Sequence, residues 1–486
     1  MRVRPMTAAA LLTLAAQSSL GGQSDQAFPR DVYAARRAAL MRQIGDAAAI
    51  IPGRYLVGQT DLVKQDANFW YLTGVESPYA VLVLTPSRST LFLPDRFQFA
   101  GGQYPMIDPA FRRATWNQPV RRLSPGPAAV AATGIAETLP IDELATDLPS
   151  LLASTPTIYV PHDDSVLYAP AGLAAPMTVA QQIERALAGA VPGKHVENLS
   201  PILNRMRLVK DTHEVAALRR AAEISGEGLV AAMRAVRPGM NDNEVAGLME
   251  YTWKRAGSPR ASFAPIVASG PHAMTLFTLM GEVYNPVDRV MRDGDLLFVD
   301  YGAAEYATYT SDLCRTLPVS GRFTPEQRKY YDIVLEAQEA AIAAIKPGVM
   351  MIDAIKASAR VFRANGLDEF EDIARMGDDH VWGIMPSPTH YLTREAGITR
   401  YSAAGIGVRD LGHHIGLEVQ ESRDYSRGLE PGMVVTIEPK IYIPDRQIAI
   451  MVEDMILVTP AGHENLSAAT PKTAADIERI MAAARQ

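Results

Sequence analysis

The chain has 486 residues, with 47 Lys plus Arg against 54 Asp plus Glu, and its formal charge is -7 at pH 7. Nucleic-acid-binding proteins carry a basic surface that neutralises phosphates, so we expect no nucleic-acid partner for this acidic chain. Hydrophobic residues make up 48% and charged residues 21% of it, which is typical of a globular protein and argues against a disordered one. The length is sufficient for two hydrophobic cores. Cys314 is the only cysteine, so no intramolecular disulfide can form.

The N-terminus has the layout of a secretory signal peptide. Arg2 and Arg4 precede an apolar run from Ala8 to Ala16, and small and polar residues then lead to a cleavage position after Gly21. We therefore expect residues 1–21 to be removed and the mature protein to be exported, either to the periplasm or as a secreted protein. The alternative is a frayed N-terminus. No apolar run reaches the ~18 residues of a transmembrane helix, so we expect no stable membrane insertion.

Two domains are predicted from the change in pattern along the chain. Residues 28–204 alternate short apolar runs with helical patterns, which indicates an α/β domain. Examples are the runs AVLVLTP (80–86), STLFLPD (89–95) and TIYVP (157–161) and the helical pattern VYAARRAALMRQI (32–44). From residue 205 the helices lengthen, beginning with a stretch over 212–236 whose apolar positions follow a helical stripe. Residues 205–486 are therefore assigned to a second domain.

The second domain contains an internal repeat of helical segments. The sequences AVRPG (235–239) and AIKPG (344–348) each follow one helical stretch and precede another. Gly257 and Gly366 then follow the two turns at the same spacing. Thr324 opens the second copy with a capping box, TPEQ, in which the proline takes the first helical position. The alternative is a coincidence among common Pro-Gly turns.

The strands of the two copies also correspond. The segments GDLLFVD (294–300) and GMVVTIE (432–438) both place a carboxylate six residues after a glycine. Two halves built from a helix pair and strands, and facing each other, would bring Asp300 and Glu438 to related positions. The repeat therefore predicts a pseudo-twofold domain with an acid from each half near its centre.

Four carboxylates occupy corresponding places in the two halves. Alternation along LLFVD puts Asp300 on the face of its apolar neighbours, toward a core, where an unpaired carboxylate would cost several kcal/mol. A hairpin can bring Asp312 back beside Asp300 on an adjoining strand. Glu438 and Glu453 have the corresponding positions in the second half. Each acid taken singly is more simply a solvated residue at a strand end. Four at related places predict a cation site.

The charge of these acids indicates two divalent ions, because four carboxylates carry -4 and two such ions carry +4. Paired ions can share a bridging water, whose lowered pKa makes it a nucleophile while the ions polarise a scissile carbonyl. One imidazole is the expected fifth ligand, and LGHHIGLEV (411–419) offers His413 and His414. An oxygen-rich set with one nitrogen suits Mn²⁺, with Co²⁺, Fe²⁺ or Zn²⁺ as alternatives.

The residues resemble those of the aminopeptidase P and prolidase family, metallopeptidases of the pita-bread (creatinase/aminopeptidase-like) fold that act on Xaa-Pro bonds. The segments that carry the resemblance are KQDANFWYLTG (64–74), IVASGPHA (266–273), VDYGAAEYATYTSDLCRT (299–316), LGHHIGLEV, LEPGMVVTIEP (429–439) and MVEDMILVT (451–459). The resemblance implies an α+β protein, with an aminopeptidase P-like N-terminal domain before a pseudo-twofold catalytic domain. It also implies a peptide substrate and, since relatives are often dimers or tetramers, a homo-oligomer.

The resemblance assigns the metal ligands residue by residue. They are Asp300, Asp312, His413, Glu438 and Glu453. His413 and Glu438 are the candidate catalytic residues, with Glu438 as general acid/base beside the bridging water. The expected activity is hydrolysis of Xaa-Pro bonds at the N-terminus of peptides by a metal-bridging hydroxide, of the aminopeptidase or the dipeptidase type. One residue more than usual separates the two Asp ligands, which a hairpin loop around 304–308 could absorb.

Four candidate substrate-binding positions depart from the family pattern. Phe277, Arg409, Gln420 and Met451 stand where relatives usually have residues that line the proline pocket, bind the substrate carbonyl or steady an acidic ligand. These changes leave the hydrolytic residues intact and predict a weaker preference for proline. Alternatively, Phe277 and Met451 pack in the core, Arg409 pairs with a neighbouring acid and Gln420 is an exposed amide.

Two other functions stay open at this point. A pita-bread domain can serve as a non-catalytic peptide-binding module after losing its metals, although five retained ligands argue against this. A metal-dependent hydrolase of the same fold with a non-proline or non-peptide substrate is supported only by the altered substrate positions. Metal analysis separates the first alternative from a peptidase, and a panel of peptides separates the second.

Export predicts where the mature chain begins. We expect protein recovered from outside the cytoplasm of its native host to start between about residues 15 and 26, because a charged start and a short apolar run are cleaved there. N-terminal sequencing of that protein measures the start directly. An intact Met1 would contradict the export prediction.

Overall fold

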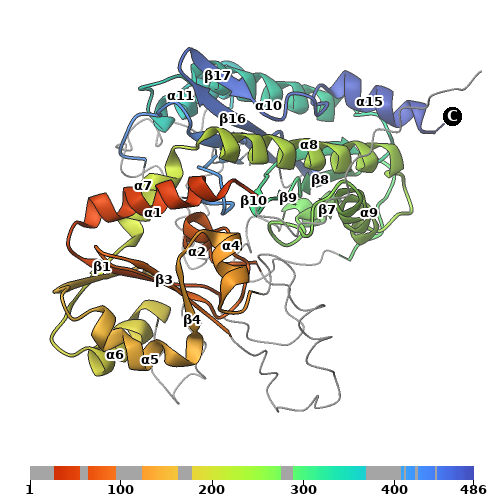
Figure 1. Ribbon diagram of the computed structural model, residues 1–486. Helices are drawn as coiled ribbons and strands as arrows, with labels where there is room; N and C mark the ends of the chain where they lie inside the picture. The colour runs from red at the N-terminus through yellow and green to blue at the C-terminus, as the bar shows by residue number, and fades with distance from the viewer. Residues whose placement is uncertain are drawn as a thin grey trace, which may run out of the picture. The chain divides into compact units, whose positions relative to one another are not determined.

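The computed structural model describes residues 27–54, 64–94, 123–162, 178–274, 288–367, 407–409, 412–421, 425–443 and 446–485 (Figure 1). The predicted signal segment and Phe277 lie outside the described residues. Within the described ranges, no helix has both the length and the apolar character needed to cross a membrane. The boundaries at 28–204 and 205–486 stay predictions.

A six-stranded mixed sheet organises the N-terminal part, in the order β4-β3-β2-β1-β5-β6. Its strands are β1 (Ala48–Pro52), β2 (Val81–Leu84), β3 (Ser89–Leu93), β4 (Glu137–Pro140), β5 (Thr157–Val160) and β6 (His195–Asn198). Strands β1, β5 and β6 run parallel, as do β3 and β4, while β2 and β3 are antiparallel. The apolar runs predicted as strands in this part do form strands of this sheet.

The helices of this part alternate with the strands along most of the sequence, as is typical of an α/β pattern. They are α1 (Arg30–Ile44), α2 (Ala67–Thr73), α4 (Pro127–Thr133), η1 (Ile141–Glu143), α5 (Leu144–Leu151), α6 (Val179–Ala190) and α7 (Ser200–Leu208). The motif KQDANFWYLTG forms α2: the Asp66 side chain accepts a hydrogen bond from Phe69 N, and Gly74 ends the helix in a left-handed conformation with φ 67°. A side chain at Gly74 would also collide with Tyr33.

The predicted repeat appears as two helix pairs, α8 (Thr212–Ala235) with α9 (Asp242–Arg255) and α10 (Pro325–Ala344) with α11 (Met351–Ala364). Capping boxes begin the first three of these helices, at Asp211, Asn241 and Thr324. The turns between the paired helices each contain a glycine with positive φ, 92° at Gly239 and 83° at Gly348. The Pro-Gly turns therefore have the same structural role in both halves.

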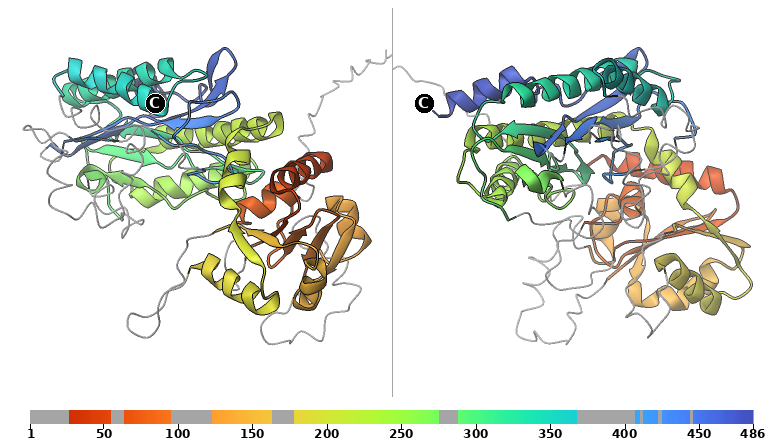
Figure 2. Two further views of the ribbon diagram at one scale, coloured as in Figure 1. Left: turned by 90° about the vertical axis from the view of Figure 1, so that its left-hand side faces the viewer. Right: turned by 180° about the vertical axis from the view of Figure 1, so that it is seen from behind.

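Three small antiparallel sheets and a hairpin lie among these helices. The strands are β7 (Val267–Ser269), β8 (Leu296–Asp300), β9 (Glu305–Tyr306), β10 (Tyr309–Thr310), β11 (Cys314–Pro318), β12 (Gly407–Arg409), β13 (Val434–Ile437), β14 (Lys440–Ile443), β15 (Ile448–Met451), β16 (Asp454–Thr459) and β17 (Gly462–Asn465). The sheet orders are β11-β8-β7, β12-β14-β15 and β13-β16-β17, and β9 pairs with β10. A short η2 (Gly270–Met274) follows β7, and α15 (Ala474–Ala483) ends the described chain. In Figure 2 the strands lie between the α8–α9 and α10–α11 pairs.

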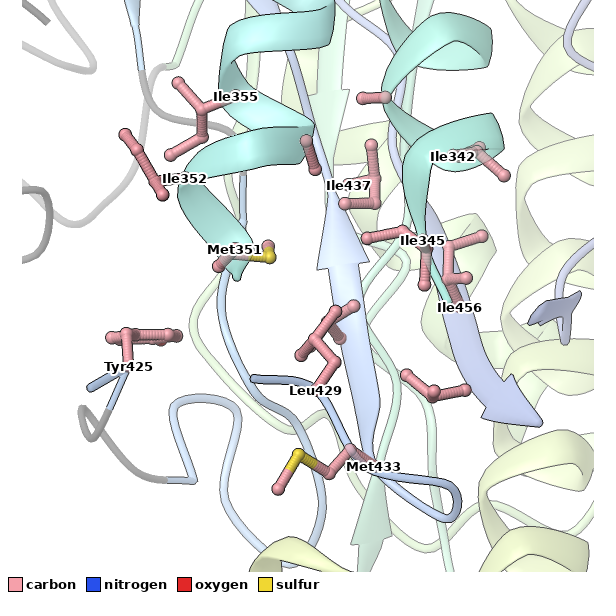
Figure 3. Packing of buried hydrophobic residues seen from close by; sticks show 14 of the residues in the cluster. Ile342, Ile345, Met351, Ile352, Ile355, Tyr425, Leu429, Met433, Ile437 and Ile456 are labelled. Atoms are coloured by element: carbon pink, nitrogen blue, oxygen red, sulfur yellow. The ribbon is translucent and has the colours of Figure 1, made fainter. Parts of the chain in front are cut away.

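A hydrophobic cluster fixes the second helix pair on the strands that lead to the site (Figure 3). Ile345 and Met351, at the turn between α10 and α11, pack with Ile437 of β13 and Ile456 of β16. All four side chains are buried. Burying such side chains stabilises the fold by about 1.5–3 kcal/mol each before entropy is counted. This packing fixes the end of β13, directly before Glu438.

A glycine in α8 provides a test of the close helix packing. A methyl group at Gly228 would lie 2.2 Å from Nε1 of the buried Trp253 on α9. We expect Gly228→Ala to destabilise the protein by about 1–3 kcal/mol, because overpacking forces a shift of the ring or the helix. Gly247→Ala in α9 is the matched control, since its methyl group would meet no atom within 4 Å. The control should be stabilised, as alanine favours helix by ~1 kcal/mol over glycine. Thermal unfolding of both variants measures the difference, and equal midpoints would show that this contact is not tight.

Candidate metal centre

The five predicted ligands come from separate segments of the catalytic part. Asp300 ends β8, Asp312 precedes β11 by two residues, His413 lies in the segment before β13, Glu438 follows β13, and Glu453 lies between β15 and β16. Side chains of all four acids are buried, with Glu453 only 1% exposed. The structure therefore brings together residues that are far apart in the sequence. Asp300 and Glu453, the first and the last of them, are separated by 153 positions.

The geometry around the first two acids differs in one respect from the prediction. In the antiparallel pair of β8 and β11, Cys314 lies opposite Asp300, so Asp312 precedes the paired strand and is not opposite Asp300 within it. The chain can turn this closely because Gly302 approaches Leu313, and a Cβ at Gly302 would lie 2.3 Å from the Leu313 Cβ. Strand β8 is also buried along its whole length, so both of its faces are covered.

The extra residue between the two Asp ligands falls within a stretch that contains a hairpin, as predicted. Strands β9 and β10 pair antiparallel, with Tyr306 opposite Tyr309. The two residues between them, Ala307 and Thr308, both have positive φ, at 50° and 71°. Positive φ at both central positions is the geometry of a two-residue turn that matches the twist of the strands. This conformation is strained for residues with a Cβ, so the surrounding structure has to hold it.

The segment with His413 runs beside β13. His413 N donates to Thr436 Oγ1 at 3.0 Å, and Thr436 N donates to the His413 carbonyl at 2.8 Å. Gly412, at φ 139°, lies so close to Thr436 that a Cβ would overlap its carbonyl oxygen. His413 Nδ1 lies 3.2 Å from the His414 carbonyl, which can only accept a hydrogen bond. Nδ1 is therefore protonated, and Nε2 is the ring nitrogen that faces the acids and could bind a cation.

His413, Asp312 and Glu453 lie close enough together to hold a metal ion. One ligand atom from each lies within 4.8 Å of the others. His413 Nε2 is 3.4 Å from Asp312 Oδ2 and 3.7 Å from Glu438 Oε1. Among the described residues, Asp312 Oδ1 and both carboxylate oxygens of Glu453 are buried without a hydrogen-bond partner. Buried acceptors of this kind are costly unless a cation satisfies them, so these residues fit divalent metal ions.

When no cation is present, burial and mutual repulsion disfavour the negatively charged forms of the acids. Burial raises the pKa of Asp300 well above its ordinary value, and the charges of Asp312 and Glu438 raise it further. The same causes act on Glu453, whose pKa is also raised well above its ordinary value. Burial raises the pKa of Asp312, although a hydrogen bond with His413 opposes the shift. Burial disfavours the charged imidazole, but Asp312 and Glu438 outweigh it and raise the pKa of His413.

Lys440 is a member of this cluster that the sequence analysis missed. Its Nζ donates to Glu438 Oε2 at 2.7 Å, and both side chains are largely buried. The pattern contains a signal for it, because residues two apart on an extended chain point to the same side. Lys440 follows Glu438 by two residues at the start of β14. The ammonium therefore adds one positive charge to the four acids.

A buried ion pair, also missed, fixes the segment that follows His413. Arg207, at the end of α7, donates from Nε to Glu421 Oε1 at 2.7 Å. Glu421 N donates to the His414 carbonyl at 2.9 Å, which joins this pair to the histidine segment. Burial disfavours the charge of Glu421, but the neighbouring Arg207 and Lys210 outweigh it and lower its pKa. Breaking such a buried pair typically costs about 3–5 kcal/mol.

The four candidate substrate-binding residues are placed differently from one another. Phe277 lies outside the described residues, and Arg409 is described only by its backbone, opposite Lys440 in the pair of β12 and β14. Gln420 is exposed. Met451 is fully buried in a cluster with Phe298 and Cys314. Core packing accounts for the position of Met451, and substrate contacts of all four remain predictions.

Two family models and several related proteins match this chain. The model of metallopeptidase family M24 matches residues 216–460, and that of the aminopeptidase P N-terminal domain matches residues 33–159. The Xaa-Pro aminopeptidase of Escherichia coli is 31% identical over 479 residues, which cover 94% of this chain and 99% of that protein. Xaa-Pro aminopeptidase 1 of Streptomyces coelicolor is 30% identical, covering 93% of this chain and 87% of that protein.

Solved structures confirm the predicted fold. The aminopeptidase PepP of Pseudomonas aeruginosa matches with a TM-score of 0.75 at 30% identity, covering 94% of this chain and 99% of that chain. Aminopeptidase P of E. coli, solved with the inhibitor Pro-Leu, matches with a TM-score of 0.73 at 29% identity and the same coverage. The E. coli enzyme has also been solved with zinc substituted and product bound. This chain therefore belongs to metallopeptidase family M24, with a pita-bread catalytic domain preceded by an aminopeptidase P N-terminal domain.

Proposed function

We propose that this protein is an Xaa-Pro aminopeptidase that hydrolyses the first bond of peptides with proline in second position, using two divalent ions. The observation that carries the proposal is the convergence of His413 Nε2 with buried, unpartnered oxygens of Asp312 and Glu453. The bond specificity is supported by relatives named Xaa-Pro aminopeptidases that align over nearly the whole of both chains. The Pro-Leu inhibitor bound by the E. coli enzyme supports a peptide substrate.

The proposed ligands are those predicted from the sequence: Asp300, Asp312, His413, Glu438 and Glu453. Bound ions would lower the pKa of water and polarise the scissile carbonyl. His413 is held in one tautomer by its contact with the His414 carbonyl, so its Nε2 is available as a ligand. Glu438 Oε2 accepts a hydrogen bond from Lys440, and the Glu438 carboxylate is the proposed group that accepts a proton from the water and returns it.

Mn²⁺ is the ion that we propose, because four carboxylates and one imidazole form an oxygen-rich set. The zinc-substituted E. coli enzyme supports zinc as an alternative in a related site. Export after removal of residues 1–21 and assembly into a homo-oligomer are further proposals. They rest on the N-terminal sequence pattern and on the family resemblance, respectively.

A reduced selectivity for proline is proposed from the changed residues. Gln420 is exposed beside the segment that carries His413, and Arg409 lies in β12. Amide and guanidinium groups can donate hydrogen bonds to a peptide, but they do so with a different reach from an imidazole. Loss of one donor to the reacting group costs on the order of 10² to 10³ in rate. The protein is therefore expected to act more slowly or more broadly than a typical relative.

The activity and the role of Glu438 can be tested together. Purified protein with Mn²⁺ is assayed on an Xaa-Pro tripeptide and its Xaa-Ala counterpart, and we expect cleavage after the first residue of the Xaa-Pro peptide. Glu438→Gln should lower the rate by about 10²-fold or more with the fold retained, because the amide cannot accept a proton. Glu464→Gln is the matched control, since Glu464 forms an exposed pair with Arg219. Its rate should stay at the wild-type value.

Two outcomes would contradict this function in different ways. Bound metal without cleavage of any peptide in the panel would favour a hydrolase with a non-peptide substrate. Normal activity of Glu438→Gln would show that another group moves the proton.

The raised pKa values predict how pH affects the metal-free protein. The pKa of Asp300 and Glu453 in the folded state lies above that in the unfolded state, about 4. Their contribution to stability is therefore complete below pH ~4 and is lost as the pH rises through the folded-state values. After chelation, the free energy of unfolding should fall as the pH rises above ~4, and Mn²⁺ should reverse most of the fall.

The control for this pH effect is a variant that removes one titrating acid. Glu453→Gln should flatten the pH dependence of the metal-free protein, because the amide carries no charge at any pH. Burial raises the pKa of Asp242 to about 6, so part of the slope belongs to a residue that is not a proposed ligand. The contribution of Asp242 to the slope should be equal in the metal-free and metal-loaded proteins. Identical slopes in both forms would contradict the effect of the metal cluster.

A further inference from the structure

The first residue of α9 differs in kind from its counterpart in the second half. The spacing that separates AVRPG (235–239) from AIKPG (344–348) also separates Asp242, which begins α9, from Met351, which begins α11. Met351 packs in the hydrophobic cluster of the second half. Asp242 is buried as deeply, since 1% of it is exposed against 2% of Met351. The fold therefore accepts an apolar residue at this position, and the carboxylate in the first half requires a separate explanation.

The Asp242 carboxylate faces the end of β7 and the segment before β8. Its Oδ2 accepts a hydrogen bond from Ser269 N at 3.3 Å, which is long for such a bond, and its Oδ1 is buried without a hydrogen-bond partner among the described residues. Arg289 is a neighbouring positive charge, but its Nη1 donates to Asp295 Oδ2 at 2.5 Å and to Ser269 Oγ at 2.6 Å. One guanidinium is therefore shared by two largely buried acids, and it compensates the charge of Asp242 only in part.

These surroundings make the charge of Asp242 dependent on pH near neutrality. Burial raises the pKa of Asp242 to about 6, although hydrogen bonds from Ser269 and the charge of Arg289 oppose the rise, and the charge of Asp295 adds to it. An aspartate that reaches water has a pKa of ~4. Above pH 6 the ionised carboxylate therefore favours an arrangement in which water can reach it.

Ser269 and Gly270 form the junction of β7 and η2, and this junction is closely packed on the same groups. Gly270 has φ 54°, and a Cβ there would lie 2.8 Å from Asp295 Oδ1. The short helix η2 packs against β8 and β15, and its Ala273 belongs to a buried cluster with Met451. The β7–η2 junction therefore connects α9 to the strands that lie beside the proposed metal ligands.

We propose that Asp242 is a pH-sensitive latch, which holds the β7–η2 junction against α9 when it is protonated and loosens the junction when it is ionised. The protonated acid carries no charge, so Arg289 is left to Asp295 alone. After ionisation, two acids compete for one guanidinium, and the buried charge is relieved when Ser269 moves away and water enters. The latch does not depend on bound metal, because none of these residues is a proposed ligand.

The two pKa values determine the size of the effect. With a pKa of about 6 in the closed arrangement and ~4 in the open one, the equilibrium constant for opening should rise about 10-fold between pH 5 and pH 8. The sign follows from the raised pKa, since the closed arrangement binds the proton more tightly and loses stability as the proton leaves.

The test is hydrogen exchange of the full-length protein, supplied with Mn²⁺ to keep the acids of the metal site from titrating. Mass spectrometry follows peptides that cover residues 267–274. Because Ser269 N donates to Asp242 itself, its exchange reports directly on the latch. After correction for the intrinsic effect of pH on exchange, protection of this amide should fall about 10-fold from pH 5 to pH 8. Asp242→Asn carries no charge at either pH, so its protection should be the same at both.

Asp353→Asn is the matched control, since Asp353 lies exposed in the first turn of α11. It should show the same pH dependence as the wild type. Asp242→Met is a second variant, which introduces the residue of the second half in case asparagine disturbs the fold, and it should also abolish the pH dependence. Equal protection of the wild-type junction at pH 5 and pH 8 would overturn the proposal. A pH dependence that persists in both folded Asp242 variants would overturn it as well.

Discussion

The buried group of four carboxylates is the constraint on which the rest of the catalytic part depends. Asp300, Asp312, Glu438 and Glu453 are each less than a tenth exposed, so water cannot screen their mutual repulsion. Protons, the Lys440 ammonium and divalent ions are the three sources of compensating charge. Only the ions also satisfy the unpartnered oxygens of Asp312 and Glu453, and they bring the chemistry of the M24 family.

The fold brings these acids together by using one arrangement twice. In each half, a helix pair packs against strands, and an acid lies at the end of a strand: Asp300 ends β8 and Glu438 follows β13. Apolar packing beneath β13 and the close approach of Gly412 to Thr436 fix the backbone on the Glu438 side. Rigid backbone near a metal matters because ligand distances must hold within a few tenths of an ångström.

Local sequence patterns predict much of this structure, but they do not predict the contacts between residues that are distant in the sequence. The capping box at Thr324, the Pro-Gly turns and the buried strands depend on neighbouring residues, and each is confirmed. The placement of Asp312 before β11 depends on register, which alternation alone does not determine. The pair of Arg207 with Glu421 joins residues that are 214 positions apart, and no local pattern indicates it. Lys440 lies between these two cases. The side of the chain to which it points was predictable from the sequence, but its contact with Glu438 was not.

Lys440 also changes the charge balance inferred from the acids alone. Four carboxylates and two divalent ions cancel, but the ammonium leaves one positive charge in excess, which a hydroxide could neutralise. Before any metal binds, the same ammonium reduces the repulsion among the acids and so stabilises the metal-free fold. Stability without metal and affinity for the ions are thus opposed, because a charge that favours the empty site disfavours the filled one. A site built in this way can fold before both ions are bound.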